Sequence, residues 1–233
     1  MQNIWKIKRY DIVSSTNDVA KELSKDIKEP TVIVAETQTS GRGRRGNKWI
    51  SKTGNLFFSQ IFSSRTTVSN LAFVTSLSVV EAICNFNHNT NVAIKWPNDI
   101  LIEDKKIAGI LIENTPENNV ILGIGVNIIS NPDTSEISYH STNLSANGIT
   151  SSKERLLEEY LKMFDKNYAL CMQNFELLRI KWLQYASHLD QKIKVKRKNN
   201  VEEGIFKGID EQGLLLLEQD SKISKIAVAE VFF

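Results

Sequence analysis

The chain has 233 residues, of which 41% are hydrophobic and 24% charged, and its formal net charge at pH 7 is +2. This length suits one sizeable domain or one domain with a small appendage, and the composition is that of globular proteins with a real core. The sequence lacks the long apolar run of a membrane span, and residues 1–10 lack the apolar centre of a signal peptide. A charge so close to neutral does not by itself indicate nucleic acid binding.

Alternation and helical spacing predict the elements of the first part of the chain. A strand is expected at residues 5–10, and a helix carrying Val19, Ala20, Leu23 and Ile27 follows, with Ser15 and Asp18 as its capping box. Buried strands are expected at 31–35 and 56–62, and a largely buried helix at 69–83.

The middle of the chain predicts an antiparallel meander, because short turns separate successive strands. Strands are expected at 92–96, 100–103, 107–113 and 120–128, with turns at Asp104–Lys105 and Pro116–Asn119. A polar loop at 129–148 leads to a helix that Ser151 and Glu154 cap, and a further helix is expected from about 175 to 186.

The character of the sequence changes at about Leu189, so we expect a larger domain at 1–188 and a small one at 189–233. Strands at 192–197, 214–218 and 223–231, with turns at Asn199–Asn200 and 211–213, predict a small β-barrel. The alternating lysines of the first of these strands are more typical of a solvated face than of nucleic acid binding.

The most informative stretch is Gly41-Arg42-Gly43-Arg44-Arg45-Gly46, followed by Asn47-Lys48-Trp49. Glycines let a backbone lie close against a ligand, and arginines add fixed charge and fork-shaped donors. The loop therefore suits a carboxylate or a phosphate, although a flexible basic turn is the alternative. It is neither a Walker A loop nor a dinucleotide fingerprint, because the spacing of its glycines fits neither.

Five stretches occur in a fixed order, and a sixth, at 208–218, lies in the tail. They are Ser14-Ser-Thr-Asn17, Gln38-Thr-Ser-Gly-Arg-Gly-Arg-Arg-Gly-Asn-Lys-Trp49, Lys95-Trp-Pro-Asn-Asp99, Lys106-Ile-Ala-Gly-Ile-Leu-Ile-Glu113 and Gly123-Ile-Gly-Val-Asn127. Together they resemble the biotin protein ligases, also called biotin–[acetyl-CoA-carboxylase] ligases, over nearly the whole chain.

The resemblance implies an α+β fold, a mixed β-sheet backed by helices and related to class II aminoacyl-tRNA synthetases and lipoate ligases. It also implies an SH3-like barrel at the C-terminus. The implied activity uses ATP and Mg²⁺ to convert biotin to biotinyl-5′-AMP, and then transfers biotin to a lysine of a biotin carboxyl carrier domain. A cytoplasmic protein is expected, and a homodimer is left open.

Many members of the family begin with a DNA-binding winged helix-turn-helix. Residues 1–13 leave no room for one before Ser14, so we expect a ligase that does not bind DNA or a membrane. The family barrel often ends with a basic residue near the nucleotide phosphates, whereas this chain ends Glu230-Val-Phe-Phe233, so a contact between barrel and nucleotide stays open.

The resemblance also implies roles for individual residues. The implied catalytic residues are Lys106, Arg44 and Asp99, with Asp99 also near the metal. The implied biotin site comprises Ser15, Thr16, Asn17, Gln38, Gly41, Arg42, Gly43, Arg44, Lys106, Gly109, Leu111 and Gly123. The implied ATP and adenylate site comprises Arg44, Arg45, Gly46, Lys48, Trp49, Asn98, Asp99, Lys106 and Asn127.

Each of these roles has a structural alternative. Trp49 is also typical of a core anchor, Asn127 of a turn, and Asn98 with Asp99 of a type I turn after Pro97. Lysines in a hairpin turn, such as Lys106, are ordinarily exposed. The alternative functions are a lipoate or octanoate ligase or transferase of the same fold and a non-catalytic biotin sensor. The Gly/Arg loop and Lys95–Asp99 belong to the biotin branch and favour the biotin ligase.

Overall fold

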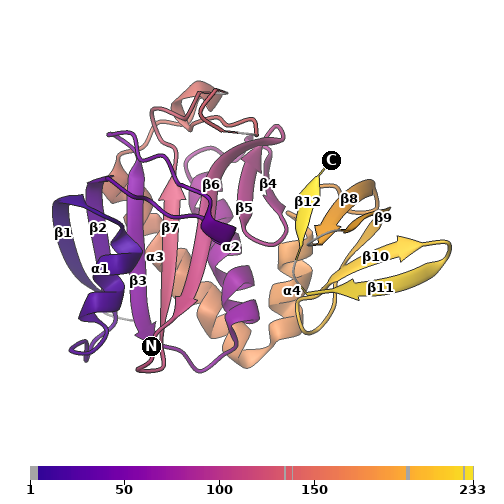
Figure 1. The fold of residues 1–233 in the computed structure, drawn as a ribbon, viewed down its shortest axis with the longest axis horizontal. Coiled ribbons are helices and arrows are strands. Elements are labelled where there is room, and N and C mark those ends of the chain that lie inside the picture. The colour runs from indigo at the N-terminus through magenta and orange to yellow at the C-terminus, as the bar shows by residue number, and fades with distance from the viewer. Residues whose placement is uncertain (1–4, 134, 138, 198–199, 228, 233) are drawn as a thin grey trace.

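The computed structural model describes residues 5–232 except 134, 138, 198, 199 and 228. Asn199 of the predicted turn, the chain end Phe233 and residues 1–4 therefore lie outside the described residues. The larger of two sheets contains β1 (Lys6–Val13), β2 (Thr31–Gln38), β3 (Leu56–Ser63), β4 (Val92–Lys95), β5 (Asp99–Ile102), β6 (Lys105–Asn114) and β7 (Asn119–Val126). Its strand order is β1-β2-β3-β7-β6-β5-β4 (Figure 1).

The larger sheet is mixed, because β1 and β2 are parallel whereas the other neighbours are antiparallel. The strands from β4 to β7 follow one another as the predicted meander. Helices α2 (Val68–Cys84), α3 (Lys153–Gln173) and α4 (Phe175–Leu183) lie behind the sheet in Figure 1, and α1 (Thr16–Leu23) lies in front of it. This confirms the predicted α+β arrangement of a mixed sheet backed by helices.

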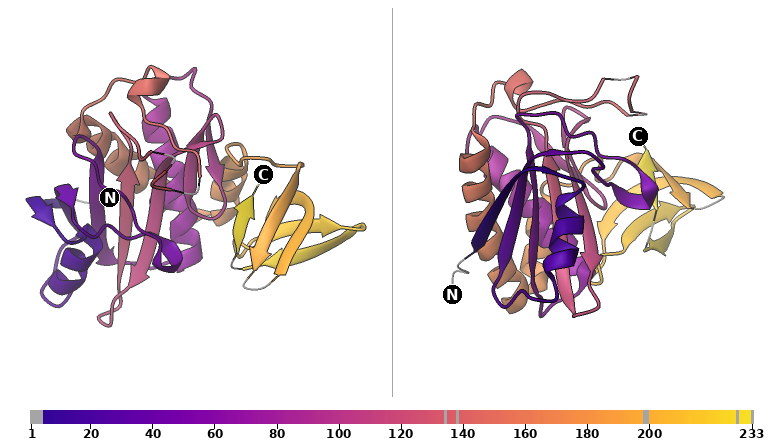
Figure 2. Two further views of the ribbon diagram at one scale, coloured as in Figure 1. Left: turned by 45° about the horizontal axis from the view of Figure 1, so that its top comes forward. Right: turned by 60° about the vertical axis from the view of Figure 1, so that its left-hand side comes forward.

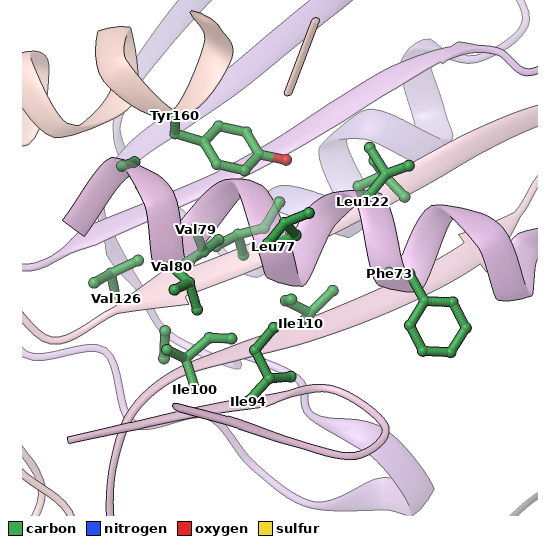
Figure 3. Close-up of a cluster of buried hydrophobic side chains, with 14 of the residues drawn as sticks. Phe73, Leu77, Val79, Val80, Ile94, Ile100, Ile110, Leu122, Val126 and Tyr160 are labelled. Carbon is green, nitrogen blue, oxygen red and sulfur yellow. The ribbon is translucent and has the colours of Figure 1, made fainter. Parts of the chain in front are cut away.

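The main core lies between the sheet and α2 with α3. Leu77 and Val80 of α2 face the sheet residues Ile94 and Ile110 (Figure 3), and all four are buried. Phe73 of the same helix is also buried and packs edge-on against Trp182 of α4. Burial of this apolar surface stabilises the sheet–helix layer at about 25 cal/mol per Å². The rear face of the sheet is thus fully occupied by packing, which leaves the front face for a ligand.

The front face is covered only in part. Ala20 of α1 packs on Ile33, Ile61 and Ile121, and these four residues form a separate small core. Side chains alternate along a strand, so the positions that follow Ile121 on the same face of β7 are Gly123 and Gly125. The sheet beside α1 is therefore flat, so that the side chains of Asn17 and Trp49 lie directly on Gly123 and Gly125.

A second sheet follows α4. It contains β8 (Lys192–Arg197), β9 (Asn200–Ile209), β10 (Leu215–Gln219), β11 (Lys222–Ile226) and β12 (Glu230–Phe232), all antiparallel, in the order β11-β10-β9-β8-β12. Figure 2 shows β12 on the side that faces the larger sheet. The five strands agree with the predicted C-terminal β-unit, whereas closure into a barrel and the boundary at residue 189 stay predictions.

Four local predictions are wrong. The hairpin between β5 and β6 turns at Glu103 and Asp104, which have φ of 48° and 59°, so Lys105 already belongs to β6. Two successive positive φ values are what a two-residue type I′ turn needs. The expected single strand at 223–231 is interrupted, and becomes β11 and β12.

Two caps also differ from the prediction. Ser15 stands at the N-cap of α1, but its side chain makes no capping hydrogen bond, so the capping box with Asp18 does not form. At α3 the capping side chain is Ser152, whose Oγ accepts the Arg155 N–H, rather than Ser151. Across the described residues, no helix combines the length and the apolar character that crossing a membrane requires.

Candidate active site

A cleft of about 780 Å³ opens on the front face of the larger sheet. The predicted site residues that line it are Ser15, Thr16, Asn17, Gln38, Arg42, Gly43, Arg44, Arg45, Lys48, Trp49, Asn98, Asp99, Lys106, Gly109, Leu111 and Gly123. Segments from several parts of the larger domain and from β8 and β12 thus meet in one cavity of a size typical of small-molecule sites. Three predicted residues, Gly41, Gly46 and Asn127, do not line it.

The floor of the cleft is made of glycines on two paired strands. Gly109 of β6 lies directly opposite Gly125 of β7, and the Trp49 ring rests on both. A Cβ built on Gly125 would lie 2.4 Å from Trp49 Cε2, and one on Gly109 would lie 2.9 Å from Trp49 Cζ3. Glycine is therefore required at these positions for the indole to lie flat on the sheet.

One end of the cleft is a closed network of polar side chains at the start of α1. Gln38 Oε1 accepts the Thr16 N–H at 2.8 Å and the Thr16 hydroxyl at 3.2 Å. The Ser59 hydroxyl lies 2.7 Å from Thr16 Oγ1 and 2.5 Å from Asn17 Oδ1. These partners fix the side chains before any ligand binds. Ser15 lacks a capping bond and lines the same end, so its hydroxyl is available to a ligand.

The Gly/Arg loop, residues 41–49, folds back on itself. The Gly43 N–H donates to Asn47 O at 2.7 Å, and the Trp49 N–H donates to Gly41 O at 2.9 Å. Arg45 has φ of 55° inside a short 3₁₀ turn, η1 (Arg44–Gly46). The loop is thus an ordered wall of the cleft, although a basic Gly-rich turn can equally be flexible.

The arginines of the Gly/Arg loop have different partners. Arg44 Nη1 donates to Asn98 Oδ1 at 2.8 Å, and burial, followed by the charge of Arg45, lowers the pKa of Arg44. Arg45 Nη1 lies 3.5 Å from Glu230 Oε1 of β12. Arg42 points to Glu113 and Asp18. Only Arg44 therefore presents its charge toward the β5 end of the cleft.

Lys106 and Asp99 lie at the other end of the cleft. Lys106 Nζ is 2.7 Å from Asp99 Oδ1, and the two side chains are 17% and 24% exposed. The same ammonium lies 5.5 Å from the centre of the Trp49 ring and 5.0 Å from that of Tyr139. Aromatic faces attract a cation, so the ammonium is held on three sides. The ordinary expectation of an exposed hairpin lysine is wrong here, because Asp99, Trp49 and Tyr139 surround the Lys106 ammonium.

A third cation stands at this end. Lys95 lines the cleft, and its pKa is lowered. Burial is the main cause, the charge of Lys106 adds to it, and the charge of Asp99 acts in the opposite direction. Its Nζ also lies 5.7 Å from the centre of the Phe232 ring of β12. Lys95, Lys106 and Arg44 together gather positive charge around Asp99, with Asp104 and Glu230 also near Lys95, an arrangement suited to a polyanionic ligand.

The comparisons with known proteins fit this geometry. Residues 10–128 match the biotin/lipoate A/B protein ligase family, and residues 188–233 match the biotin protein ligase C-terminal domain. The chain belongs to the biotin/lipoate A/B protein ligase family. The matched range contains every predicted site residue named above.

Individual relatives of this ligase cover most of its length. A biotin–[acetyl-CoA-carboxylase] ligase from Paracoccus denitrificans is 32% identical, over 94% of this chain and 97% of its own. The bifunctional ligase/repressor BirA from Bacillus subtilis is 33% identical, over 95% of this chain and 72% of its own. A solved biotin protein ligase from Aquifex aeolicus in complex with biotin and ATP has a TM-score of 0.87 and 28% identity, over 97% of both chains.

The three predicted residues outside the cleft of the ligase support its walls. A Cβ on Gly41 would lie 2.5 Å from Trp49 O, so this glycine permits the loop to close, and Gly46 has φ of 79°. Asn127 is buried, donates from Nδ2 to Thr142 O at 3.0 Å, and has no partner for Oδ1 among the described residues. Its predicted contact with adenine stays a prediction.

Among the residues that the sequence gave no role, Lys95, Tyr139 and Glu230 line the cleft, and Glu113 contacts Arg42 and Asn17, which line it. Lys95 and Glu113 stand inside the recognised motifs, and Glu113 follows Gly109 and Leu111 at every second position, which is the signal that places it on the same strand face. Tyr139 and Glu230 come from a polar loop and the last strand. No periodicity links those segments to the cleft, so only the fold reveals them.

The donor set of the ligase does not form a protein cage for a metal. Within the part of the chain that the structure describes, no group of three or more His, Cys, Asp or Glu side chains could hold an ion. Asp99 and Asp104 are the aspartates that line the β5 end of the cleft. Mg²⁺ commonly binds through one or two carboxylates together with substrate phosphates and water. The residues present therefore fit Mg²⁺ that arrives with a nucleotide.

Proposed function

We propose that this ligase activates biotin with ATP and transfers it to a lysine of a biotin carboxyl carrier domain. The first step joins a biotin carboxylate oxygen to the α-phosphorus of ATP and releases pyrophosphate, which leaves biotinyl-5′-AMP. In the second step a lysine amine attacks the carbonyl carbon of this mixed anhydride. An amide forms, AMP leaves, and the nitrogen loses a proton.

The observation that supports this proposal is the division of one cleft into two chemically different ends. Neutral donors and acceptors of Thr16, Gln38 and Asn17 are fixed at one end. The cations Lys106, Lys95 and Arg44 gather at the other. This division matches a ligand that has a polar uncharged ring at one end and a carboxylate at the other, because the carboxylate must approach the triphosphate of ATP.

At the neutral end we assign the ureido ring of biotin to Ser15, Thr16 and Gln38. The amide of Gln38 is already oriented by Thr16 and by Ser51, whose Oγ accepts from Gln38 Nε2 at 3.0 Å. Donors that are fixed in advance lose little entropy on binding. The chain of the ligand would then run over Gly123 and Gly109 toward Lys106.

At the cationic end two anions must approach each other. Lys106 and Arg44 offset the repulsion between the carboxylate and the phosphates, and they stabilise the charge that develops on the α-phosphate oxygens. Asp99 holds the Lys106 ammonium at 2.7 Å and so fixes its position. Mg²⁺ bound with the nucleotide would neutralise phosphate charge, with Asp99 as the contact on the protein.

Trp49 is assigned to the adenine. Its ring lies flat on Gly109 and Gly125 beside Lys106, so a base can stack on the face that points into the cleft. The incoming carrier lysine must reach the carbonyl carbon beside Asp99 and Lys106. We assign Asp99 to orient this second amine, since it is a carboxylate already placed at the reacting end.

The proposed function is tested by the products of the first and second steps. The ligase is incubated with ATP, Mg²⁺ and either biotin or lipoate, and the acyl-adenylate is identified by mass spectrometry. An apo-carrier domain is then added, and its mass is followed. Biotinyl-5′-AMP and a carrier heavier by one biotinyl group are expected. Lipoyl-5′-AMP as the main product would instead assign the ligase to the lipoate branch.

A further inference from the structure

The carboxylate of Glu113 accepts three hydrogen bonds from two residues that lie in other parts of the chain. Arg42 Nη1 donates to Glu113 Oε1 at 2.9 Å and Arg42 Nη2 to Oε2 at 2.8 Å, which is a bidentate pair. Asn17 Nδ2 donates to the same Oε2 at 2.7 Å. Glu113 thereby joins β6 to the Gly/Arg loop and to the first turn of α1.

Glu113 does not itself line the cleft, but its partners Arg42 and Asn17 line it at the neutral end. Gly109, Leu111 and Glu113 share one face of β6, and a strand rises about 3.4 Å per residue, so Glu113 stands roughly 14 Å beyond Gly109. Gly109 is the position that faces Lys106 and Trp49. Arg42, while it is bound to Glu113, is therefore remote from the carboxylate that Lys106 is to activate.

The charges at this end do not attract an anion. Arg42 also lies 2.8 Å from Asp18 Oδ1, so one guanidinium faces two carboxylates. Burial would raise the pKa of Glu113, but hydrogen bonds from Arg42 and Asn17 outweigh it, and the pKa of Glu113 is lowered. The group is ionised at neutral pH, and the neutral end carries no excess of positive charge.

We propose that Glu113 is a positioning residue of the substrate site: it holds Arg42, and through Arg42 it holds the Gly/Arg loop over the uncharged ring of the acid substrate. The second half of the loop has its own anchor, the hydrogen bond from Arg44 to Asn98. The backbone hydrogen bonds of Gly41 and Gly43 go to Trp49 and Asn47 within the loop, so the first half is tied to β6 through Arg42. A bidentate arginine–carboxylate pair fixes both distance and orientation. This inference rests on the proposed function.

A second consequence concerns the orientation of the substrate. With Glu113 and Asp18 at one end and Lys106, Lys95 and Arg44 at the other, a carboxylate is repelled from the first end and attracted to the second. The acid therefore binds with its carboxylate toward Lys106. Loss of Glu113 would weaken binding of the acid, whereas Arg44, Asp99 and Lys106 keep their own contacts at the reacting end.

The test compares Glu113→Gln, which keeps the shape and removes the charge, with Glu117→Gln as the matched control. Glu117 stands in the turn after β6 and accepts a hydrogen bond from Ser24 at 2.8 Å, away from the cleft. Affinity for biotin alone is measured by calorimetry, and single-turnover adenylation is measured at saturating biotin. Glu113→Gln should weaken biotin binding about 10- to 100-fold. Its saturated rate and its KM for ATP should stay within about threefold of the wild type, as should every value for Glu117→Gln.

Two further variants separate positioning from folding. Glu113→Asp keeps the charge and should restore part of the lost affinity. Arg42→Ala should weaken biotin binding to a similar degree, and the double variant should be no weaker than Arg42→Ala alone, since both act through one pair. Three results would each overturn the proposal. Glu113→Gln could bind biotin as tightly as the wild type, the two substitutions could have additive effects in the double variant, or Glu113→Gln could lose rate and ATP binding as much as biotin affinity. If the wild type activates lipoate rather than biotin, the proposed function fails. The wild type, the two single variants and the double variant are then compared with lipoate as the acid.

Discussion

Lys106 Nζ lies 2.7 Å from Asp99 Oδ1, although the two residues belong to different strands and neither is fully buried. The pairing of β5 with β6 places Asp99 opposite Gly109 rather than opposite Lys106. The absence of a side chain at Gly109 leaves room for the Lys106 side chain, since a Cβ there would lie 3.2 Å from Lys106 Cε. One glycine thus permits the contact that fixes the ammonium at the reacting end.

Lys106→Ala should slow biotinyl-adenylate formation by about 10²–10³-fold, because one electrostatic donor to the transition state is lost. Biotin affinity should fall much less. Lys106→Arg should also be slow, since a planar guanidinium does not replace a compact ammonium between Asp99 and two rings. Single-turnover adenylation and calorimetry measure the two effects.

The control for Lys106 is its neighbour Lys105, which is exposed at the start of β6. Lys105→Ala should keep the wild-type rate, because successive strand residues point to opposite faces. If Lys105→Ala lowered the adenylation rate and Lys106→Ala left it unchanged, the assignment of Lys106 to the reacting end of the cleft would be wrong.

Arg44→Gly should release biotinyl-5′-AMP faster, by about 10- to 100-fold, because a charged hydrogen-bond donor no longer closes over the adenylate. Biotin itself should still bind. The expected readout is biotin attached to lysines of a bystander protein such as albumin. The exposed Arg65 provides a matched control as Arg65→Gly. Equal labelling by the two variants would exclude the clamp.

Gly125→Ala should raise the KM for ATP by about tenfold, since its Cβ would lie 2.4 Å from Trp49 Cε2 and must displace the indole. Biotin affinity should change less, because the polar network at Thr16 is not touched. Gly148→Ala is the control: its φ of 71° makes alanine strained there and lowers stability, but its Cβ meets nothing within 4 Å and it lies outside the cleft, so the KM for ATP should not change. An unchanged KM for ATP in Gly125→Ala would contradict the stacking role of Trp49.

The lowered pKa of Glu113 predicts a dependence of stability on pH. A carboxyl whose pKa is lower in the folded state than its ordinary value of 4.5 stabilises the fold above that value, and this contribution is lost as the pH falls through the folded-state pKa. The charged groups around it are Arg42, Asp18 and Lys21. The wild type should therefore exceed Glu113→Gln in free energy of unfolding at neutral pH.

That difference should shrink as the pH is lowered below 4.5 and Glu113 takes up a proton. Urea unfolding of both proteins across this range measures it. A difference that stays constant or grows with acidity would show that Glu113 is not held ionised by Arg42.

The sequence predicts the framework of this fold well, because its strands and helices carry regular patterns. The apolar stretch Leu56–Phe62 and the helical spacing after Ser69 both lie in elements that the structure contains. It is harder to predict which of two similar neighbouring residues caps a helix or begins a turn. Ser151 and Ser152 are equally good caps by composition, and only the course of the preceding chain selects Ser152.

The sequence predicts the site residues that belong to recognised motifs. It does not predict which hydrogen-bond or ion-pair partner each side chain contacts. Most predicted residues line one cleft, yet the sequence cannot tell that Arg42 turns to Glu113 whereas Arg44 turns to Asn98. Such choices depend on distances between strands that are far apart in the chain. The contact of Glu230 with Arg45 is of the same kind, since it depends on how β12 lies against the larger sheet.

The central claim is that the cleft activates biotin, and pyrophosphate exchange with biotin or lipoate tests it most directly. Lipoate would leave the polar groups of Ser15, Thr16 and Gln38 without partners, at a cost of about 1–3 kcal/mol for each buried group. We predict that the kcat/KM of biotin-dependent exchange exceeds that of lipoate-dependent exchange by at least about 100-fold, and equal values for the two acids would contradict the account.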